Sequence, residues 1–183
     1  MNLLSTLMVD GTEYFSVMER KHAVNVNGIV ELDALPEDFA ALLAKQLATD
    51  KKANKSLDRR RIKSTSARID KYFECNYSRF GGNADVKTSG ALGEREVINC
   101  PNRLTCPDQG KLCKIPCGLT KQEAIVSIHI SLGKMDAEIC HFLKISQNTL
   151  RSYKNNIEFK IKQPGKIAIG VWAYAVGLVH IKE

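Results

Sequence analysis

The stretch that decides the fold is Leu119–Ile161, LTKQEAIVSIHISLGKMDAEICHFLKISQNTLRSYKNNIEFKI. It predicts three helical segments with a start or stop signal at each join. Thr120 stands three residues before Glu123, the capping-box spacing that satisfies two backbone donors at the start of a helix. Gly133 supplies a left-handed cap at the end of that helix. The apolar residues of this first segment recur at helical spacing: Ile125, Ile128 and Leu132.

The second and third segments follow closely. Asp136 is placed to cap a short helix with apolar Ile139, Cys140 and Leu143. Ser146 is placed to cap a longer one, with Leu150, Ile157 and Ile161 expected to be buried. Two short helices joined by a tight turn, the second rich in basic and amide side chains, indicate a helix-turn-helix.

The same stretch resembles the LuxR/GerE-type helix-turn-helix of bacterial transcription regulators, without a gap over 43 residues. The matching positions are Leu119-Thr120, Glu123, Gly133, Glu138-Ile139, Leu143, Ile145-Ser146, Thr149-Leu150, Asn156-Ile157 and Lys160-Ile161. Gln122, Cys140 and Tyr153 depart from it, where the family usually has Arg, Ala and His.

The resemblance implies that the helix from about Gln147 to Ile161 lies in the major groove of double-stranded DNA. It places base-reading side chains at Arg151, Ser152 and Asn155. An arginine can bind guanine through two hydrogen bonds, and an asparagine can do so for adenine. The residues expected to position the helix on phosphates are Ser146, Thr149, Tyr153, Lys154 and Lys160.

A further apolar segment, IAIGVWAYAVGLV at 167–179, resembles the fourth helix of that family. Family members often dimerise through this helix, so we expect a homodimer formed through Ile167–Leu178. RNA polymerase is a further partner to consider.

Composition and charge fit a DNA-binding protein. The chain has 183 residues, 44% of them hydrophobic, and a formal net charge of +7. No apolar run reaches the roughly 20 residues that span a bilayer, and the N-terminus lacks a signal peptide's pattern. We therefore expect a cytoplasmic protein with no membrane partner. Since no nucleophile, base and orienting group can be assembled from the motifs, we do not expect an enzyme.

The N-terminal region gives weaker signals. Short apolar runs alternate with Asp10-Gly11 and Asn27-Gly28, which are typical hairpin-turn pairs, so a small β-hairpin or meander is plausible. Residues 16–20 could equally begin a helix. A helix is predicted from Pro36, with one at about 66–76, while the Gly- and Ser-rich residues 78–95 indicate a loop.

Between those two helices lies the basic stretch Lys51–Arg68, and residues 51–71 as a whole contain nine basic and two acidic residues. Charge runs are usually a solvated helix face or linker. The alternative is an electrostatic strip that meets the DNA backbone. Both interpretations stay open.

Four cysteines lie within eighteen residues: Cys100, Cys106, Cys113 and Cys117. Such a segment has few apolar residues, and four thiolates on one Zn²⁺ would give it a reason to be ordered. Zinc is the first interpretation and an iron–sulfur cluster the second. The alternative is four separate, partly buried thiols.

Together these features predict a mainly α protein. The predicted segments are a mostly helical region at 1–95 that includes a short hairpin, a zinc segment at 96–118, and a four-helix helix-turn-helix domain at 119–183. The predicted function is a sequence-specific DNA-binding transcription regulator. The alternative is a metal-braced adaptor or sigma-factor-like protein that acts mainly through protein contacts with the transcription machinery.

Overall fold

The computed structural model describes residues 11–81 and 83–179. The chain divides into two compact units, which we call the N-terminal unit (Met1–Ile98 with Lys111–Lys114) and the C-terminal unit (Asn99–Gly110 with Ile115–Glu183). The described residues form seven α-helices and a four-stranded antiparallel sheet. The mainly α prediction is therefore corrected to a mixed fold, and the predicted segment boundaries at 95 and 118 stay predictions.

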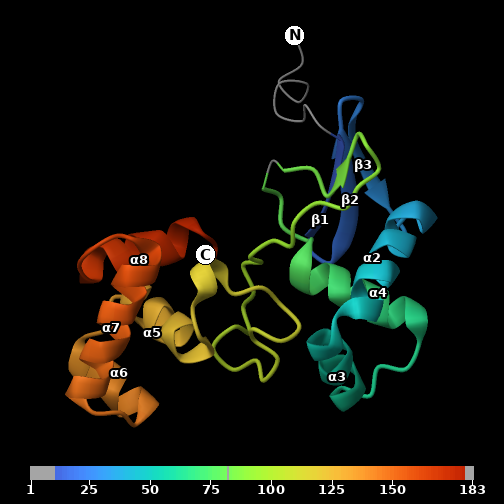
Figure 1. Ribbon diagram of the computed structural model, residues 1–183. Helices are drawn as coiled ribbons and strands as arrows, with labels where there is room; N and C mark the ends of the chain where they lie inside the picture. Colours follow the sequence, from blue (N-terminus) through green and yellow to red (C-terminus); the bar gives the residue numbers. More distant parts are fainter. Residues whose placement is uncertain (1–10, 82, 180–183) are drawn as a thin grey trace. The chain divides into compact units, whose positions relative to one another are not determined.

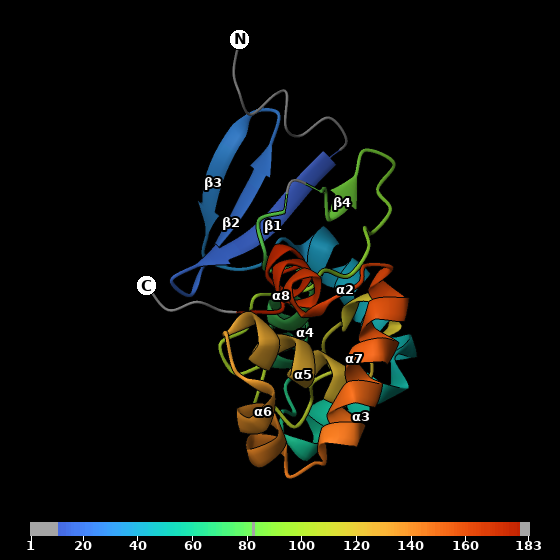
Figure 2. The same ribbon diagram turned by 90° about the vertical axis from the view of Figure 1, so that its left-hand side faces the viewer.

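The sheet belongs to the N-terminal unit and has the strand order β3-β2-β1-β4 (Figure 2). Its strands are β1 (Gly11–Val17), β2 (Arg20–Asn25), β3 (Gly28–Leu32) and β4 (Val86–Lys87). The plausible meander is thus present, although Asp10 of the first predicted turn lies outside the described residues. Strand β4 falls inside the stretch predicted to be a loop, where two residues are too few to show a β pattern.

The turn between β1 and β2 is Met18–Glu19, and it contains none of the glycine, asparagine or aspartate residues that are typical of such turns. Met18 and Glu19 have φ of 48° and 68°, and the flanking Val17 and Arg20 pair across the hairpin. Two positive φ values in a two-residue loop match the twist of the strands, and glycine or asparagine usually supplies them. The structure therefore makes residues 16–20 a hairpin and not the start of a helix.

Three helices complete the N-terminal unit: α2 (Glu37–Thr49), α3 (Lys51–Arg59) and α4 (Thr65–Asn76). The helix predicted from Pro36 is confirmed, with Pro36 preceding its first turn. The core joins sheet and helices through aromatic rings, as Tyr14 of β1 stacks on Phe39 of α2 with centroids 4.0 Å apart. Phe73 of α4 meets Phe39 edge-on, an arrangement that aromatic pairs favour.

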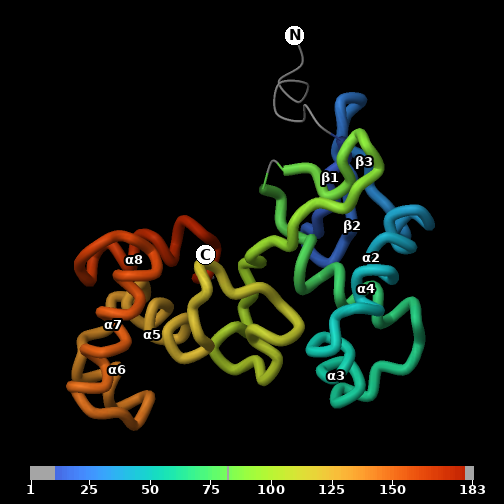
Figure 3. Tube along the Cα trace, viewed as in Figure 1, coloured from blue at the N-terminus to red at the C-terminus, as the bar shows by residue number. Residues whose placement is uncertain are grey.

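One arginine ties a later segment to this unit. Arg95 donates to the Asn76 side chain at 2.6 Å, to Asp50 at 2.8 Å and to the Leu112 carbonyl at 2.9 Å. Leu112 is buried in the same core. Between β4 and residue 116 the chain otherwise runs as turns and loops (Figure 3). Residues 111–114 are therefore held to the N-terminal unit by the Arg95 hydrogen bond and the burial of Leu112.

The C-terminal unit is helical (Figure 1). A short 3-10 turn at Pro116–Gly118 leads into α5 (Lys121–Ser131), α6 (Asp136–Leu143), α7 (Gln147–Ile161) and α8 (Lys166–Ala175). The four helices predicted here are confirmed, and α7 has the predicted bounds. In the described ranges, no helix combines the length and apolarity that crossing a bilayer requires.

Candidate nucleic-acid interface

Helices α6 and α7 are joined by a three-residue turn. Lys144 adopts a left-handed conformation with φ of 52°, and the Ile145 amide donates to the Cys140 carbonyl at 3.1 Å. Ser146 then caps α7, because its hydroxyl accepts the Thr149 amide at 3.1 Å. A turn this short between two helices is typical of a helix-turn-helix.

The first cap of α6 differs from the predicted one. Met135 occupies the N-cap position, and Asp136 is the first helical residue. The Glu138 carboxylate accepts the Met135 amide at 2.7 Å. Asp136 therefore does not cap α6, and its carboxylate binds lysines of two other helices instead.

Asp136 links three helices. Its carboxylate oxygens lie 2.6 Å from Lys154 Nζ on α7 and 3.0 Å from Lys166 Nζ on α8. Hydrogen bonds from Lys154 and then Lys166 hold the pKa of Asp136 below its ordinary value. Lys154, which the sequence predicts on phosphate, is thus engaged within the protein.

Lys160 is engaged in the same way. Its Nζ lies 2.6 Å from Glu123 Oε2, while Thr120 and Glu123 form the predicted capping box at the start of α5. Burial alone would raise the pKa of Glu123, but hydrogen bonds from Lys160 and Thr120 outweigh it and the pKa falls. This pair fixes α7 against α5, with Leu150 and Ile157 fully buried beneath it.

The opposite face of α7 carries the predicted reading residues. Arg151, Ser152 and Asn155 are exposed. Ser152 donates to the Asn148 carbonyl. Within residues 11–81 and 83–179, the Arg151 and Asn155 side chains have no hydrogen-bond or ion-pair partner. Their donors are therefore available to an outside ligand.

Sequence reasoning missed a residue on this face. Asn148 is exposed and lies four residues before Ser152 and seven before Asn155, which places all three on one side of the helix. The helical repeat alone was enough to find it. The residues predicted to contact phosphate fall into two groups. Ser146 and Thr149 cap the start of α7, and Tyr153, Lys154 and Lys160 are half-buried along it.

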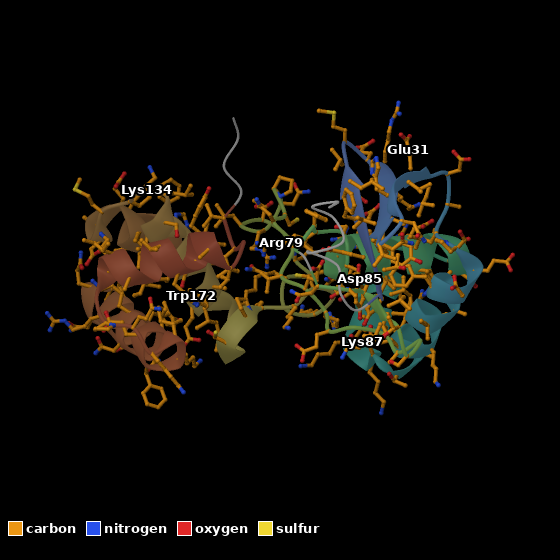
Figure 4. All side chains as sticks on the ribbon, turned by 90° about the horizontal axis from the view of Figure 1, so that it is seen from above. Glu31, Arg79, Asp85, Lys87, Lys134 and Trp172 are labelled. Atoms are coloured by element: carbon orange, nitrogen blue, oxygen red, sulfur yellow. The ribbon has the colours of Figure 1, made fainter. Side chains whose placement is uncertain are left out.

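His129 is buried on α5, and its ring stacks on Phe142 with centroids 5.6 Å apart. Burial, followed by the charge of Lys134, lowers the pKa of His129. Lys134, labelled in Figure 4, stands at the α5–α6 join.

Helix α8 presents an apolar face to solvent. Ile167, Val171 and Tyr174 are 83%, 63% and 61% exposed, and their spacing of four and three residues puts them on one side of the helix. Leu178, included in the predicted dimer segment, lies beyond α8 and is buried. The exposed face is thus shorter than the predicted one.

The four clustered cysteines are free thiols in the part of the chain that the structure describes. Cys100, Cys106 and Cys113 are half-buried, and Cys117 is exposed. Cys113 belongs to the N-terminal unit and the other three to the C-terminal unit. Among the described residues, no group of three or more His, Cys, Asp or Glu side chains is arranged to hold a metal. The placement does not fit zinc or an iron–sulfur cluster, and both stay predictions.

Comparison with known proteins gives a partial match. No family model matches the chain. Over 60 residues, 33% of this chain, the sequence is 35% identical to the regulatory protein SdiA of Escherichia coli (strain K12). The matched segment covers 25% of that protein, so the chain spans about a quarter of the length of this relative.

Proposed function

We propose that this protein is a sequence-specific DNA-binding transcription regulator with a LuxR/GerE-type helix-turn-helix. The observation that carries the proposal is the outward face of α7, where Arg151 and Asn155 are exposed without partners among the described residues. The similarity to a regulatory protein supports it.

The α6–turn–α7 arrangement suits the major groove. Base edges there are read by hydrogen bonds from a helix held at a fixed angle. Here α7 is held on its inner side by Lys160–Glu123 and Lys154–Asp136. Arg151, Ser152 and Asn155 would read bases, and Asn148 would extend the contact toward the start of the helix.

Phosphate contacts would come from both ends of α7. The exposed Lys144 precedes it, and the exposed Lys162 follows it. Lys154 and Lys160 remain proposed phosphate contacts, with their ion pairs holding the ammonium groups close to the protein surface. Ser146, Thr149 and Tyr153 complete the proposed positioning set.

The test begins by selecting duplexes from a random pool with the wild-type protein. Fluorescence anisotropy then compares Arg151→Ala with Arg20→Ala, an exposed arginine of the N-terminal unit. Loss of a bidentate guanine contact costs about 1–3 kcal/mol of discrimination, so Arg151→Ala should lower the preference for the selected duplex about 5- to 150-fold. If no sequence is enriched, or if both variants behave like wild type, the proposal is wrong.

Two further proposals accompany this one. Two chains would pack against each other through the exposed face of α8, which consists of Ile167, Val171 and Tyr174. Sedimentation with a duplex that carries two half-sites would then show two chains per duplex. Zinc binding by the four cysteines is supported by their spacing along the chain and not by their placement. Metal analysis of the reduced protein decides it: one zinc per chain would support zinc binding, and no metal would mean four separate thiols.

A further inference from the structure

A strongly charged surface lies on α3 and the turn that follows it, in the N-terminal unit. Residues 51–63 carry seven basic side chains and a single acidic one, Asp58. All seven are exposed. We call them the α3 basic surface: Lys51, Lys52, Lys55, Arg59, Arg60, Arg61 and Lys63.

Helix α3 gathers four of these charges on one side. At about 100° per residue, Lys51, Lys52, Lys55 and Arg59 fall within roughly 100° of arc around α3. Ala53 and Leu57, on the other side, are fully buried. From Lys51 to Arg59 the helix rises about 12 Å, over which a DNA duplex presents several phosphates at one charge per about 1.7 Å.

One arginine of the neighbouring helix binds both α3 and the turn that follows it. Arg68 of α4 donates to Asp58 at 2.7 Å, to the Ile62 carbonyl at 3.0 Å and to the Asn54 side chain at 2.8 Å. The bonds join α3, the following turn and α4. They also engage the carboxylate of Asp58, so the acid is neutralised by a residue from outside the surface.

The composition of the surface identifies the class of partner. Leu57 is buried and Ile62 is half-buried, and no large apolar side chain of residues 51–63 is exposed. Protein interfaces are enriched in aromatic side chains and depleted in lysine. Phosphate contacts require only cations, and they supply most non-specific affinity for DNA.

We propose that the α3 basic surface binds the phosphate backbone of double-stranded DNA without reading its sequence. The proposal rests on the proposed function, because it makes the N-terminal unit a second contact on the nucleic acid that α7 reads. Two linked contacts on one chain bind more tightly than either alone. The surface should therefore contribute affinity and salt dependence, and α7 should contribute preference.

The test uses the full chain and a random-sequence duplex. Anisotropy measures the dissociation constant at NaCl concentrations from about 50 to about 300 mM. The variant is Lys51→Gln/Lys55→Gln. The control is Lys87→Gln/Lys111→Gln, which removes the same charge from two other exposed lysines of the N-terminal unit; Figure 4 labels Lys87. Circular dichroism checks that each variant is folded, and Lys52→Gln/Lys63→Gln provides a second pair.

Each lost phosphate contact lowers the slope of log K against log salt by about 0.9. We expect the α3 variants to lose up to about 1.8 in slope and to bind about tenfold more weakly near physiological salt, with the control close to wild type. Equal behaviour of the α3 variants and the control overturns the inference. So does stronger competition by single-stranded RNA or polyglutamate than by duplex.

These outcomes separate the two proposals. If Arg151→Ala loses preference for the selected duplex while the α3 variants match the control, the inference fails and the proposed function stands. If the α3 variants lose salt-dependent duplex binding while no sequence is ever enriched, the surface binds DNA and the proposed sequence reading fails.

Discussion

The Asp136 carboxylate joins α6 to two other helices, because it binds Lys154 of α7 and Lys166 of α8. We predict that Asp136→Asn lowers the free energy of unfolding of the C-terminal unit by about 1 kcal/mol at pH 7. The carboxylate is partly exposed, so solvent screening keeps the loss small. The fluorescence of Trp172, the single tryptophan, reports unfolding of α8.

The pH dependence of that loss has a definite sign. The pKa of Asp136 is lowered in the folded protein, so its stabilisation is present above the ordinary value of 3.8 and disappears as pH falls through the lowered pKa. Wild type and Asp136→Asn should therefore converge in acid. Glu158→Gln is the matched control on α7, and an equal loss in the control would contradict the prediction.

Prediction at the scale of the residue succeeded where helical spacing decides exposure. Leu150, Ile157 and Ile161 are buried and Arg151 and Asn155 exposed, as expected. It missed the partners of lysines. Asp136 lies 18 residues before Lys154, and Glu123 lies 37 before Lys160, and no local pattern shows which acid a lysine will meet once the helices pack.

At the scale of the element, the β1–β2 hairpin carries backbone strain. Glu19 has φ of 68°, a conformation that costs a side-chain-bearing residue roughly 1–2 kcal/mol. We predict that Glu19→Gly stabilises the N-terminal unit by up to about 1 kcal/mol after the entropy of glycine is subtracted. Hydrogen exchange of the β2 amides measures the change.

Glu19→Ala is the control for that substitution. Alanine keeps the Cβ atom that clashes at positive φ while removing the carboxylate, so it should leave exchange near the wild-type rate. Stabilisation of similar size by alanine would show that charge and not backbone strain is responsible.

The helices with local capping signals could be predicted from the sequence, and the β1–β2 turn and β4 could not. Helices with capping signals, such as α5 at Thr120 and α7 at Ser146, were placed from the sequence because their ends are specified locally. The Met18–Glu19 turn has no such signal, and β4 exists because Val86 and Lys87 pair with β1 from far along the chain. Strand β4 therefore depends on long-range pairing, and the turn depends on the pairing of the two strands that flank it.

At the scale of the whole molecule, the N-terminal unit buries acidic groups. Burial raises the pKa of Asp85 to about 8, with Glu96 and Glu13 adding to it, and burial raises the pKa of Glu96 to about 7. The Tyr14 amide opposes the first shift. The amide and charge of Arg79 and the charge of Lys114 oppose the second. Stability is then complete below the ordinary values of 3.8 and 4.5 and is lost as pH rises through 7 to 8.

We predict that β1 amides exchange faster at about pH 9 than at about pH 6 after correction for intrinsic rates. These two pH values lie on either side of the raised pKa values of Asp85 and Glu96. Asp85→Asn keeps an acceptor for the Tyr14 amide and removes the charge. It should raise the free energy of unfolding at the higher pH on the order of 1 kcal/mol, with a smaller gain at the lower pH, where less of the stabilisation has been lost. An equal gain at both pH values would contradict a titration origin.

The hydrogen bonds that Arg95 and Asn76 donate to the Leu112 carbonyl have a consequence for biosynthesis. The chain leaves the N-terminal unit at residue 99, rejoins it at 111 and leaves again at 115. A ribosome must therefore translate most of the cysteine segment before the first unit can close over Leu112. A fragment truncated at Ile98 would emerge with Arg95 and Asn76 lacking the Leu112 carbonyl that both bind, and it should be an early substrate for proteases.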